Sequence, residues 1–349
     1  TSIGDHVFSG LTNLTSLIIG NSVADIGSNA FTGATSLSSL TIPNSVTAID
    51  SRAFSGASVM TSVEIPNSVT TIGDYAFAGS GLQTVTIPDS VTTIGTGAFE
   101  GSLSLNSVSI PSSVTHIGNS AFASTNLTTV MIPDSVENLG SNAFQNTSSL
   151  ASITLGSGIT EIKSHTFENT SLTSITIPDS VTSIGYRAFY NATSLTEVDL
   201  GSGVTGIAQE AFRGTALEQL TLPDSVASIG RRAFAQLPIK NLTIGNGINS
   251  RDAIDLNAFY GICNTLETVS INSPNGMGQG SSEHIYYYES DSFHTSGSKY
   301  YYKGLHFSDT ACNKLTSINL GNDVTSIGDH VFSGLTNLTS LIIGNSVAD

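Results

Sequence analysis

The chain has 349 residues, of which 27 are acidic and 11 are basic, so its formal net charge is −16. Phosphate binding requires clustered lysine and arginine, so this balance excludes nucleic acid as the expected partner. Hydrophobic residues make up 39% of the chain, but none of its apolar runs approaches the ~18 residues of a membrane helix, so we expect a folded protein with no membrane insertion in this segment.

A phenylalanine that usually follows alanine recurs along the whole chain. Successive copies are 22 to 25 residues apart, except for one step of 48 residues. The copies are Phe8, Phe31, Phe54, Phe77, Phe99, Phe122, Phe144, Phe167, Phe189, Phe212, Phe234, Phe259, Phe307 and Phe332. This period is too short for a propeller blade or a helical pair, so it predicts a solenoid of about 14 turns.

Each turn is expected to begin with a short strand and to end with a brief helical segment, as residues 82–105 illustrate. Residues 85–87 alternate apolar and polar side chains and are rich in β-branched residues, which predicts a strand with one buried face. Pro88 ends this strand because proline lacks an amide donor. Gly95 then allows a turn into a helical or 3₁₀ segment that buries Phe99. The sequence therefore predicts a β-rich α/β solenoid with turns of 22–25 residues.

Two motifs carry a resemblance to a known family. Ser-Val-Thr-x-Ile-Gly-x-x-Ala-Phe-x-Gly, followed by Leu-x-x-Leu-x-Ile-Pro, recurs over nearly the whole chain and resembles the BspA-like leucine-rich-repeat (LRR_5-type) family. The resemblance implies a right-handed leucine-rich-repeat coil. It also implies a cell-surface or secreted adhesin that binds host matrix proteins or other cells. The family offers no catalytic residues to carry over.

A column of short polar residues follows the strand in successive turns. Its members are Asn44, Asn67, Asp89, Ser112, Asp134, Ser157, Asp179, Ser202, Asp224 and Asn246. One interpretation is a row of calcium sites, because hard cations bind several oxygen ligands. The other is that each side chain caps its turn by bonding a backbone amide. Aspartate alternates with uncharged residues, which separates the carboxylates and favours capping, so we expect no cofactor.

The histidines suggest no catalytic site. They are His6, His116, His165, His284, His294, His306 and His330, mostly on different turns, and none falls in a metalloprotease or hydrolase motif. Glu283, His284, Asp291 and His294 lie near one another in sequence, but their spacing matches no strong metal motif. We therefore expect no enzyme activity.

Cys263 and Cys312 are the two cysteines, and each lies three residues before a strand leucine. The equivalent position in other turns holds Ala34, Ala57, Ser80 and Thr147. Equivalent positions on adjacent turns lie about 5 Å apart, which a disulfide tolerates. A disulfide between the two cysteines is one expectation; the alternative is a pair of buried free thiols. The BspA-like family often carries cysteine at this position.

Residues 273–306 interrupt the repeat and divide the chain into regular turns over 1–272, an insertion over 273–306, and further turns over 307–349. We expect the insertion to be a β-hairpin with a polar tip. Tyrosine is enriched at interfaces, so one interpretation is a contact surface formed by Tyr286, Tyr287, Tyr288, Tyr300, Tyr301 and Tyr302. The alternative is that one tyrosine face packs back onto the solenoid.

Residues 325–349 repeat residues 1–25 without a change. This identity implies a larger repeat of 324 residues, and both copies are ordinary turns rather than polar caps. The expectation is an extracellular or cell-surface structural protein that is one unit of a longer uncapped rod or filament. The alternative is a monomeric adhesin that binds a protein ligand through a concave sheet or the tyrosine hairpin. The partner is then either a second copy, end to end, or another protein, and we expect any secretion signal to lie outside this segment.

Overall fold

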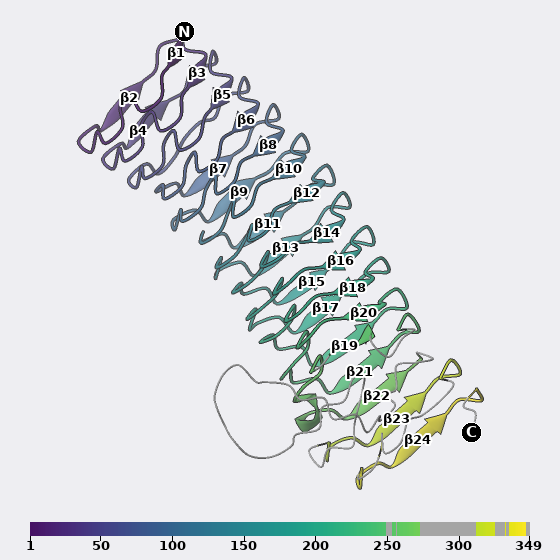
Figure 1. Ribbon diagram of the computed structural model, residues 1–349. Coiled ribbons are helices and arrows are strands. Elements are labelled where there is room, and N and C mark those ends of the chain that lie inside the picture. Colours follow the sequence, from purple (N-terminus) through teal and green to yellow (C-terminus); the bar gives the residue numbers. More distant parts are fainter. Residues whose placement is uncertain (249–252, 256, 273–311, 325–331, 333–334, 347–349) are drawn as a thin grey trace. The chain divides into compact units, whose positions relative to one another are not determined.

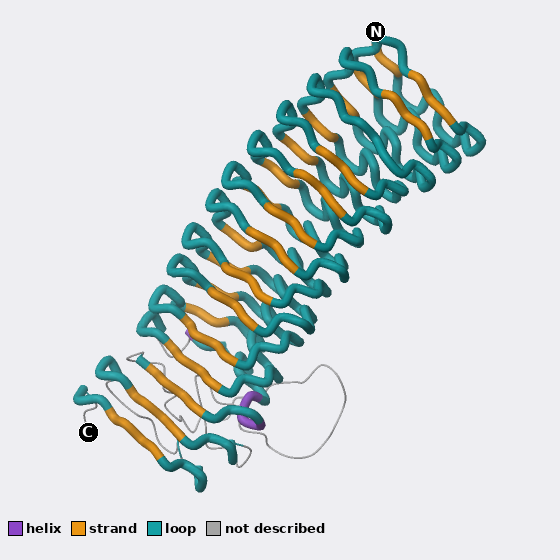
Figure 2. The backbone as a smooth tube through the Cα atoms, turned by 180° about the vertical axis from the view of Figure 1, so that it is seen from behind, coloured by secondary structure: helices purple, strands orange, loops and turns teal. Residues whose placement is uncertain are grey.

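The computed structural model describes residues 1–248, 253–255, 257–272, 312–324, 332 and 335–346 (Figure 1). The chain divides into two compact units. The first comprises Thr1–Val204 and Ala211–Ala216, and the second comprises Thr205–Glu210 and Leu217–Asp349. Within each unit, successive turns of the chain lie side by side (Figure 2). The units are described separately below.

Nearly every turn contributes a strand of three or four residues to one side of the solenoid. In the first unit these long strands are β2 (Ser16–Ile18), β4 (Ser39–Thr41), β7 (Thr84–Thr86), β9 (Ser107–Ser109), β11 (Thr129–Met131), β13 (Ser152–Thr154), β15 (Ser174–Thr176) and β17 (Glu197–Asp199). In the second unit they are β19 (Gln219–Leu222), β21 (Asn241–Ile244), β22 (Thr268–Ile271), β23 (Ser317–Leu320) and β24 (Ser340–Ile343).

A second strand of two residues follows in most turns. In the first unit these short strands are β1 (Ser2–Ile3), β3 (Asp25–Ile26), β5 (Ala48–Ile49), β6 (Thr71–Ile72), β8 (Thr93–Ile94), β10 (His116–Ile117), β12 (Asn138–Leu139), β14 (Glu161–Ile162) and β16 (Ser183–Ile184). In the second unit they are β18 (Gly206–Ile207) and β20 (Ser228–Ile229).

All described strand pairs are parallel and join equivalent residues of neighbouring turns. In the first unit one sheet contains seven short strands, in the order β1, β3, β5, β6, β8, β10 and β12, and Val130 of β11 lies opposite Ile153 of β13 in another sheet. In the second unit, β19, β21, β22, β23 and β24 form a five-stranded sheet in chain order. The pairing of β22 with β23, Val269 opposite Ile318, continues the same register across the 273–306 insertion. Each unit is a parallel β-solenoid, and the chain has about 13 turns in all.

The phenylalanine column forms the centre of the core. In the first unit the rings from Phe8 to Phe212 stack face to face, with centroids of neighbouring rings 5.0 to 5.8 Å apart. In the second unit, Phe234 and Phe259 stack at 5.4 Å. The predicted burial is confirmed for the ten phenylalanines from Phe31 to Phe234, which are at most 1% exposed. It is wrong for Phe8, which is 39% exposed, and for Phe259 and Phe332, which are half-buried, while Phe307 lies outside the described residues.

The expected α/β class is wrong, because the Ala-Phe segments are not helical. Almost all the described residues are strand or turn, and the helix is confined to short 3₁₀ pieces such as η2 (Ile262–Asn264). The residue two before each column phenylalanine from Phe8 to Phe259 has a left-handed backbone, as at Arg52 with a φ of 55°. The Phe54 N–H then donates to the carbonyl of Ala76 in the next turn at 2.8 Å. In a helix these amides would donate to carbonyl groups of the same segment, four residues earlier. Here they donate to the next turn of the solenoid instead, so no helix forms.

Gly118, which follows Ile117, is required by the close approach of the preceding turn. A Cβ atom at Gly118 would lie 2.5 Å from the backbone nitrogen of Thr96 and 2.6 Å from the carbonyl carbon of Gly95. The neighbouring backbone cannot move aside without breaking the stack. Close packing of turns, rather than entry into a helix, therefore explains this glycine.

Candidate interaction surfaces

The outer strand face is the exposed side of the long strands in the first unit. On these strands the middle residue points inward and the flanking residues are exposed. From β4 to β15 the exposed residues are Ser39, Thr41, Thr84, Thr86, Ser107, Ser109, Thr129, Met131, Ser152, Thr154, Ser174 and Thr176. None of these strand residues is charged, and nearly all carry hydroxyl groups that can donate and accept hydrogen bonds. Over β4 to β15 the face can therefore bind a partner through many weak polar contacts, whereas β17 exposes the charged side chains of Glu197 and Asp199.

A polar network in the first unit lies along the phenylalanine column and was not foreseen from the sequence. The Glu168 side chain is largely buried, and its Oε2 accepts a hydrogen bond from Gln145 Nε2 at 2.6 Å. The Nδ1 atom of His165 lies 2.5 Å from the same oxygen. Asn142 Nδ2 in turn donates to Gln145 Oε1 at 2.8 Å. Buried carboxylates require such partners, so the network fixes the Glu168 side chain and the imidazole of His165.

Aromatic and cationic side chains extend this network along the same face. The ring of Tyr186 packs edge-on against His165, with centroids 5.1 Å apart. The guanidinium carbon of Arg187 lies 5.0 Å from the Tyr186 ring centroid and 4.6 Å from that of Tyr190. All four side chains are half-buried. Tyrosine and arginine with such exposure are enriched at protein interfaces.

The network could have been detected in the sequence by comparing the residues at equivalent positions of different turns, although no motif marks it. His165 and Arg187 lie two residues before a column phenylalanine, and Glu168 and Tyr190 lie one residue after one. In the turn of Phe122 the same two positions hold Ser120 and Ala123. Aligning the turns position by position shows large side chains at both positions in the consecutive turns of Phe167 and Phe189, and this coincidence would have pointed to the cluster.

The aspartates after the long strands hold neighbouring turns together. Asp134 Oδ1 accepts a hydrogen bond from the Ser157 N–H at 2.8 Å, and Asp179 Oδ1 accepts from the Ser202 N–H at 2.6 Å and from Ser202 Oγ at 2.8 Å. These backbone donors, followed by the serine hydroxyls, hold the pKa of Asp134 and of Asp179 below the usual value. The predicted hydrogen bond to a backbone amide is confirmed for these aspartates, but the amide belongs to the next turn, so the side chain joins two turns rather than capping its own. Within the described ranges, three or more metal-ligating side chains do not come together at any point.

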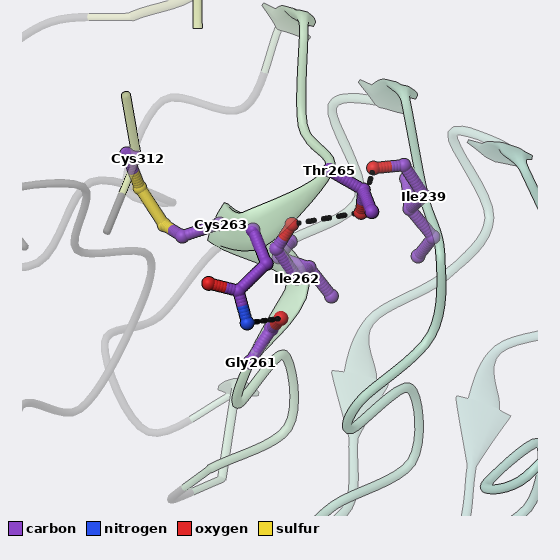
Figure 3. The surroundings of a disulfide bond; sticks show 7 residues. Ile239, Gly261, Ile262, Cys263, Thr265 and Cys312 are labelled. Carbon is purple, nitrogen blue, oxygen red and sulfur yellow. Dashed lines mark hydrogen bonds between the residues drawn. A yellow bond between two sulfur atoms is a disulfide. The ribbon is translucent and has the colours of Figure 1, made fainter. Parts of the chain in front are cut away.

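Cys263 and Cys312 are joined by a disulfide in the second unit (Figure 3). Their Cα atoms lie 4.3 Å apart although the residues are 49 positions apart in sequence. Cys263 belongs to η2, and Cys312 precedes β23, which pairs with β22 of the preceding turn. Thr265 Oγ1 donates to the carbonyl of Ile239 at 2.9 Å, which holds the chain after η2 against the preceding turn. The bridge therefore links two consecutive turns at the base of the insertion.

The predicted tyrosine contact surface cannot be placed, because Tyr286, Tyr287, Tyr288, Tyr300, Tyr301 and Tyr302 lie outside the described residues. The 273–306 hairpin lies outside them as well, and it remains a prediction. Within the part of the chain that is described, helices are too short and too polar to cross a membrane.

Comparisons with known proteins agree with this architecture. A family model described as BspA type leucine-rich repeat region matches six copies, over residues 1–102, 70–196, 182–298 and 305–349. The pneumococcal vaccine antigen PcpA has the same fold, with 23% identity, a TM-score of 0.52, and coverage of 96% of this chain and 89% of that chain. No curated protein matches the sequence.

Two further solved structures are similar to the chain. A leucine-rich repeat protein from Bacteroides ovatus is 26% identical over 77% of this chain and 82% of that chain, with a TM-score of 0.49. A leucine-rich cell surface protein from Faecalibacterium prausnitzii is 27% identical over 98% of this chain and 83% of that chain, with a TM-score of 0.46. Because the family model covers nearly the whole sequence, the chain belongs to the family of proteins with BspA-type leucine-rich repeats.

Proposed function

We propose that this protein is a non-enzymatic structural repeat protein of the cell surface, in which a 324-residue unit is extended by further turns of the same kind. The observation that carries this proposal is the identity of residues 1–25 with residues 325–349. Other turns of the chain differ from one another at many exposed positions, so selection on the core alone does not explain a 25-residue identity. A repeated unit that joins to itself does explain it.

The way in which the turns pack supports such an extension. Each inner turn is covered on both sides by residues of its own type, as Phe54 is covered by Phe31 and Phe77 at centroid distances of 5.5 and 5.6 Å. Adding one more turn buries a similar apolar area each time, so the favourable free energy grows with length. A head-to-tail contact of this kind has no closing partner and leads to a filament.

Placement outside the cell is supported by the disulfide between Cys263 and Cys312, because such bonds persist in oxidising compartments. The family resemblance also implies a protein that is exposed on cells or secreted. A net charge of −16 also favours solubility.

A second function, adhesion by a single copy, is favoured by the cluster of His165, Tyr186, Arg187 and Tyr190. These half-buried side chains pack against one another, and they belong to turns that also contribute strands to the hydroxyl-rich outer strand face. A protein ligand at the cell surface would then be the partner. Alanine substitution of Tyr186 and Tyr190 would weaken cell binding in that case, with no effect on self-association.

Sedimentation velocity of the purified chain tests the proposed function. We expect concentration-dependent association into species much larger than one chain, and stronger association in higher salt, because salt screens the repulsion between acidic copies. A single monomeric species at all concentrations and salt levels would contradict the filament and leave adhesion as the better account.

A further inference from the structure

The outer strand face contains a neutral patch of five consecutive turns, from β7 to β15. Acidic residues bound it: Glu64 is exposed at the position that Thr86 holds one turn later, and Glu197 and Asp199 follow in β17. A chain with a net charge of −16 therefore presents an extended surface without charge. The neutral patch is made of the two exposed residues of each long strand, namely Thr84, Thr86, Ser107, Ser109, Thr129, Met131, Ser152, Thr154, Ser174 and Thr176.

The hydroxyl groups of the neutral patch make no hydrogen bond to other described residues. Serine hydroxyls on other sides of the same turns are used to join neighbouring turns. Ser90 Oγ donates to the carbonyl of Val69 at 2.6 Å, and Ser113 Oγ donates to that of Val91 at 2.8 Å. Each hydroxyl of the neutral patch can donate one hydrogen bond and accept two. This capacity is left for a partner that lies on the patch.

The exposed residues of the neutral patch form a lattice in two dimensions. Thr84 lies opposite Ser107 and Thr86 lies opposite Ser109, so both columns repeat about every 4.8 Å from strand to strand. Within a strand the two columns are about 6.6 Å apart, because every second residue faces outward. β-Branching restricts the threonine side chains to few rotamers. Apart from Met131 the side chains are short, so the patch is flat and periodic.

These properties decide which kind of partner fits the neutral patch. A charged macromolecule would lose hydration there without meeting an opposite charge. Sugar rings pack on aromatic side chains, and none of the ten residues is aromatic. A typical folded protein does not present hydrogen-bonding groups at one spacing in two directions. The surface of ice does, because it is an uncharged lattice of water molecules whose donors and acceptors repeat at a spacing close to that between parallel strands.

We propose that the neutral patch binds the surface of ice crystals, with its hydroxyl columns holding a layer of water that is continuous with the crystal lattice. Each contact is weak, but the array and the crystal are both rigid, so little conformational entropy is lost when many contacts form together. A bound chain blocks the addition of water to the crystal around it. One copy is enough for this contact, so the inference goes beyond the proposed function and does not depend on it.

Nanolitre osmometry of the purified chain tests this inference. We expect the chain to keep ice crystals from growing at temperatures just below their melting point and to give them facets. The double variant Thr86→Lys with Thr154→Lys puts two long charged side chains on the neutral patch and should abolish both effects. The matched control is Thr92→Lys with Thr160→Lys, which changes exposed threonines of the same two turns, immediately before the short strands β8 and β14. The control should keep both effects, and circular dichroism shows that each variant is folded.

Three outcomes would overturn the inference. The first is that the parent chain neither delays growth nor shapes the crystals. The second is an equal loss in both double variants, since added charge rather than the neutral patch would then be the cause. The third is binding of the parent chain to cellulose or chitin particles with no effect on ice, which would assign the patch to a neutral polysaccharide. A chain that stays monomeric in the ultracentrifuge but shapes ice would contradict the filament and support this inference.

Discussion

The rings of Phe122 and Phe144 lie face to face in consecutive turns, with centroids 5.6 Å apart and planes inclined by 9°. Phe144 stacks in the same way on Phe167 at 5.8 Å, and all three side chains are fully buried. Each ring in this column therefore fills a space between two others, and no nearby side chain can take its place.

Replacing Phe144 with alanine is expected to lower the free energy of unfolding of the first unit by about 3 to 5 kcal/mol, because the ring leaves a cavity between two rigid neighbours. Urea denaturation followed by circular dichroism measures the change. Leu103, which is 73% exposed, supplies the control, and Leu103→Ala should change stability by less than about 0.5 kcal/mol. Equal effects of the two substitutions would contradict the buried column.

Replacing Gly118 with alanine is expected to destabilise the first unit strongly, because the new Cβ would lie 2.5 Å from the backbone nitrogen of Thr96. A Cβ atom added at Gly20 would meet no heavy atom within 4 Å, so Gly20→Ala should be nearly neutral. Thermal unfolding of the two variants side by side separates the effect of close approach from a general cost of losing glycine. A Gly118→Ala variant as stable as the parent would show that the turns are not packed this closely.

The aspartates of the first unit make its stability depend on pH. Hydrogen bonds from the Ser202 N–H and hydroxyl hold the pKa of Asp179 below its usual value. Such a group contributes stability that is present above the pKa of the unfolded chain, about 3.9, and is lost as pH falls through the folded value. Asp179→Ala should therefore lower the melting temperature at pH 7 and have little effect near pH 2.

Asp50 provides the control of opposite sign. Burial, and then the charges of Asp25 and Asp5, raise the pKa of Asp50. Its ionised form is disfavoured in the folded chain, so Asp50→Asn should raise the melting temperature at pH 7, with the gain disappearing below about pH 4. Melting curves from pH 2 to 8 for both variants check the two signs. Parallel curves for parent and variants across this range would refute both assignments.

The disulfide predicts that neither Cys263 nor Cys312 reacts with an alkylating reagent under denaturing conditions unless reductant is added. Intact-mass measurement before and after reduction gives the number of labelled thiols. Closing a loop of this size stabilises a chain by on the order of 4 kcal/mol in chain-entropy models, so reduction should lower the stability of the second unit. Two labelled thiols without reductant would show that packing alone holds these turns together.

Much of the fold could be predicted from the sequence because the same residue pattern recurs in nearly every turn. The spacing of Phe31, Phe54 and the later copies fixed both the period and the stacked column, and counting back from Leu266 and Leu315 brought Cys263 and Cys312 to equivalent positions. The left-handed residues could not be foreseen. Arg52, Tyr75 and Glu210 have no preference for a positive φ, and the hydrogen bonds between turns hold them in it.

The candidate surfaces were predicted less well. The prediction of a helix at the Ala-Phe pairs was wrong because the sequence does not reveal hydrogen bonds between turns. These bonds use the backbone amides that a helix would need. The contacts among Gln145, His165 and Glu168 depend on side chains from two turns, and neither turn alone carries a motif. The tyrosine hairpin stays a prediction, since residues 273–306 lie outside the described chain.

Electron cryomicroscopy of the purified chain at high concentration and moderate salt tests the central claim, that stacking of turns continues from one copy into the next. The account predicts fibres many chains long, with strands spaced about 4.8 Å apart running without interruption through each joint between copies. Isolated particles the length of one chain, under all conditions that keep the protein folded, would contradict it.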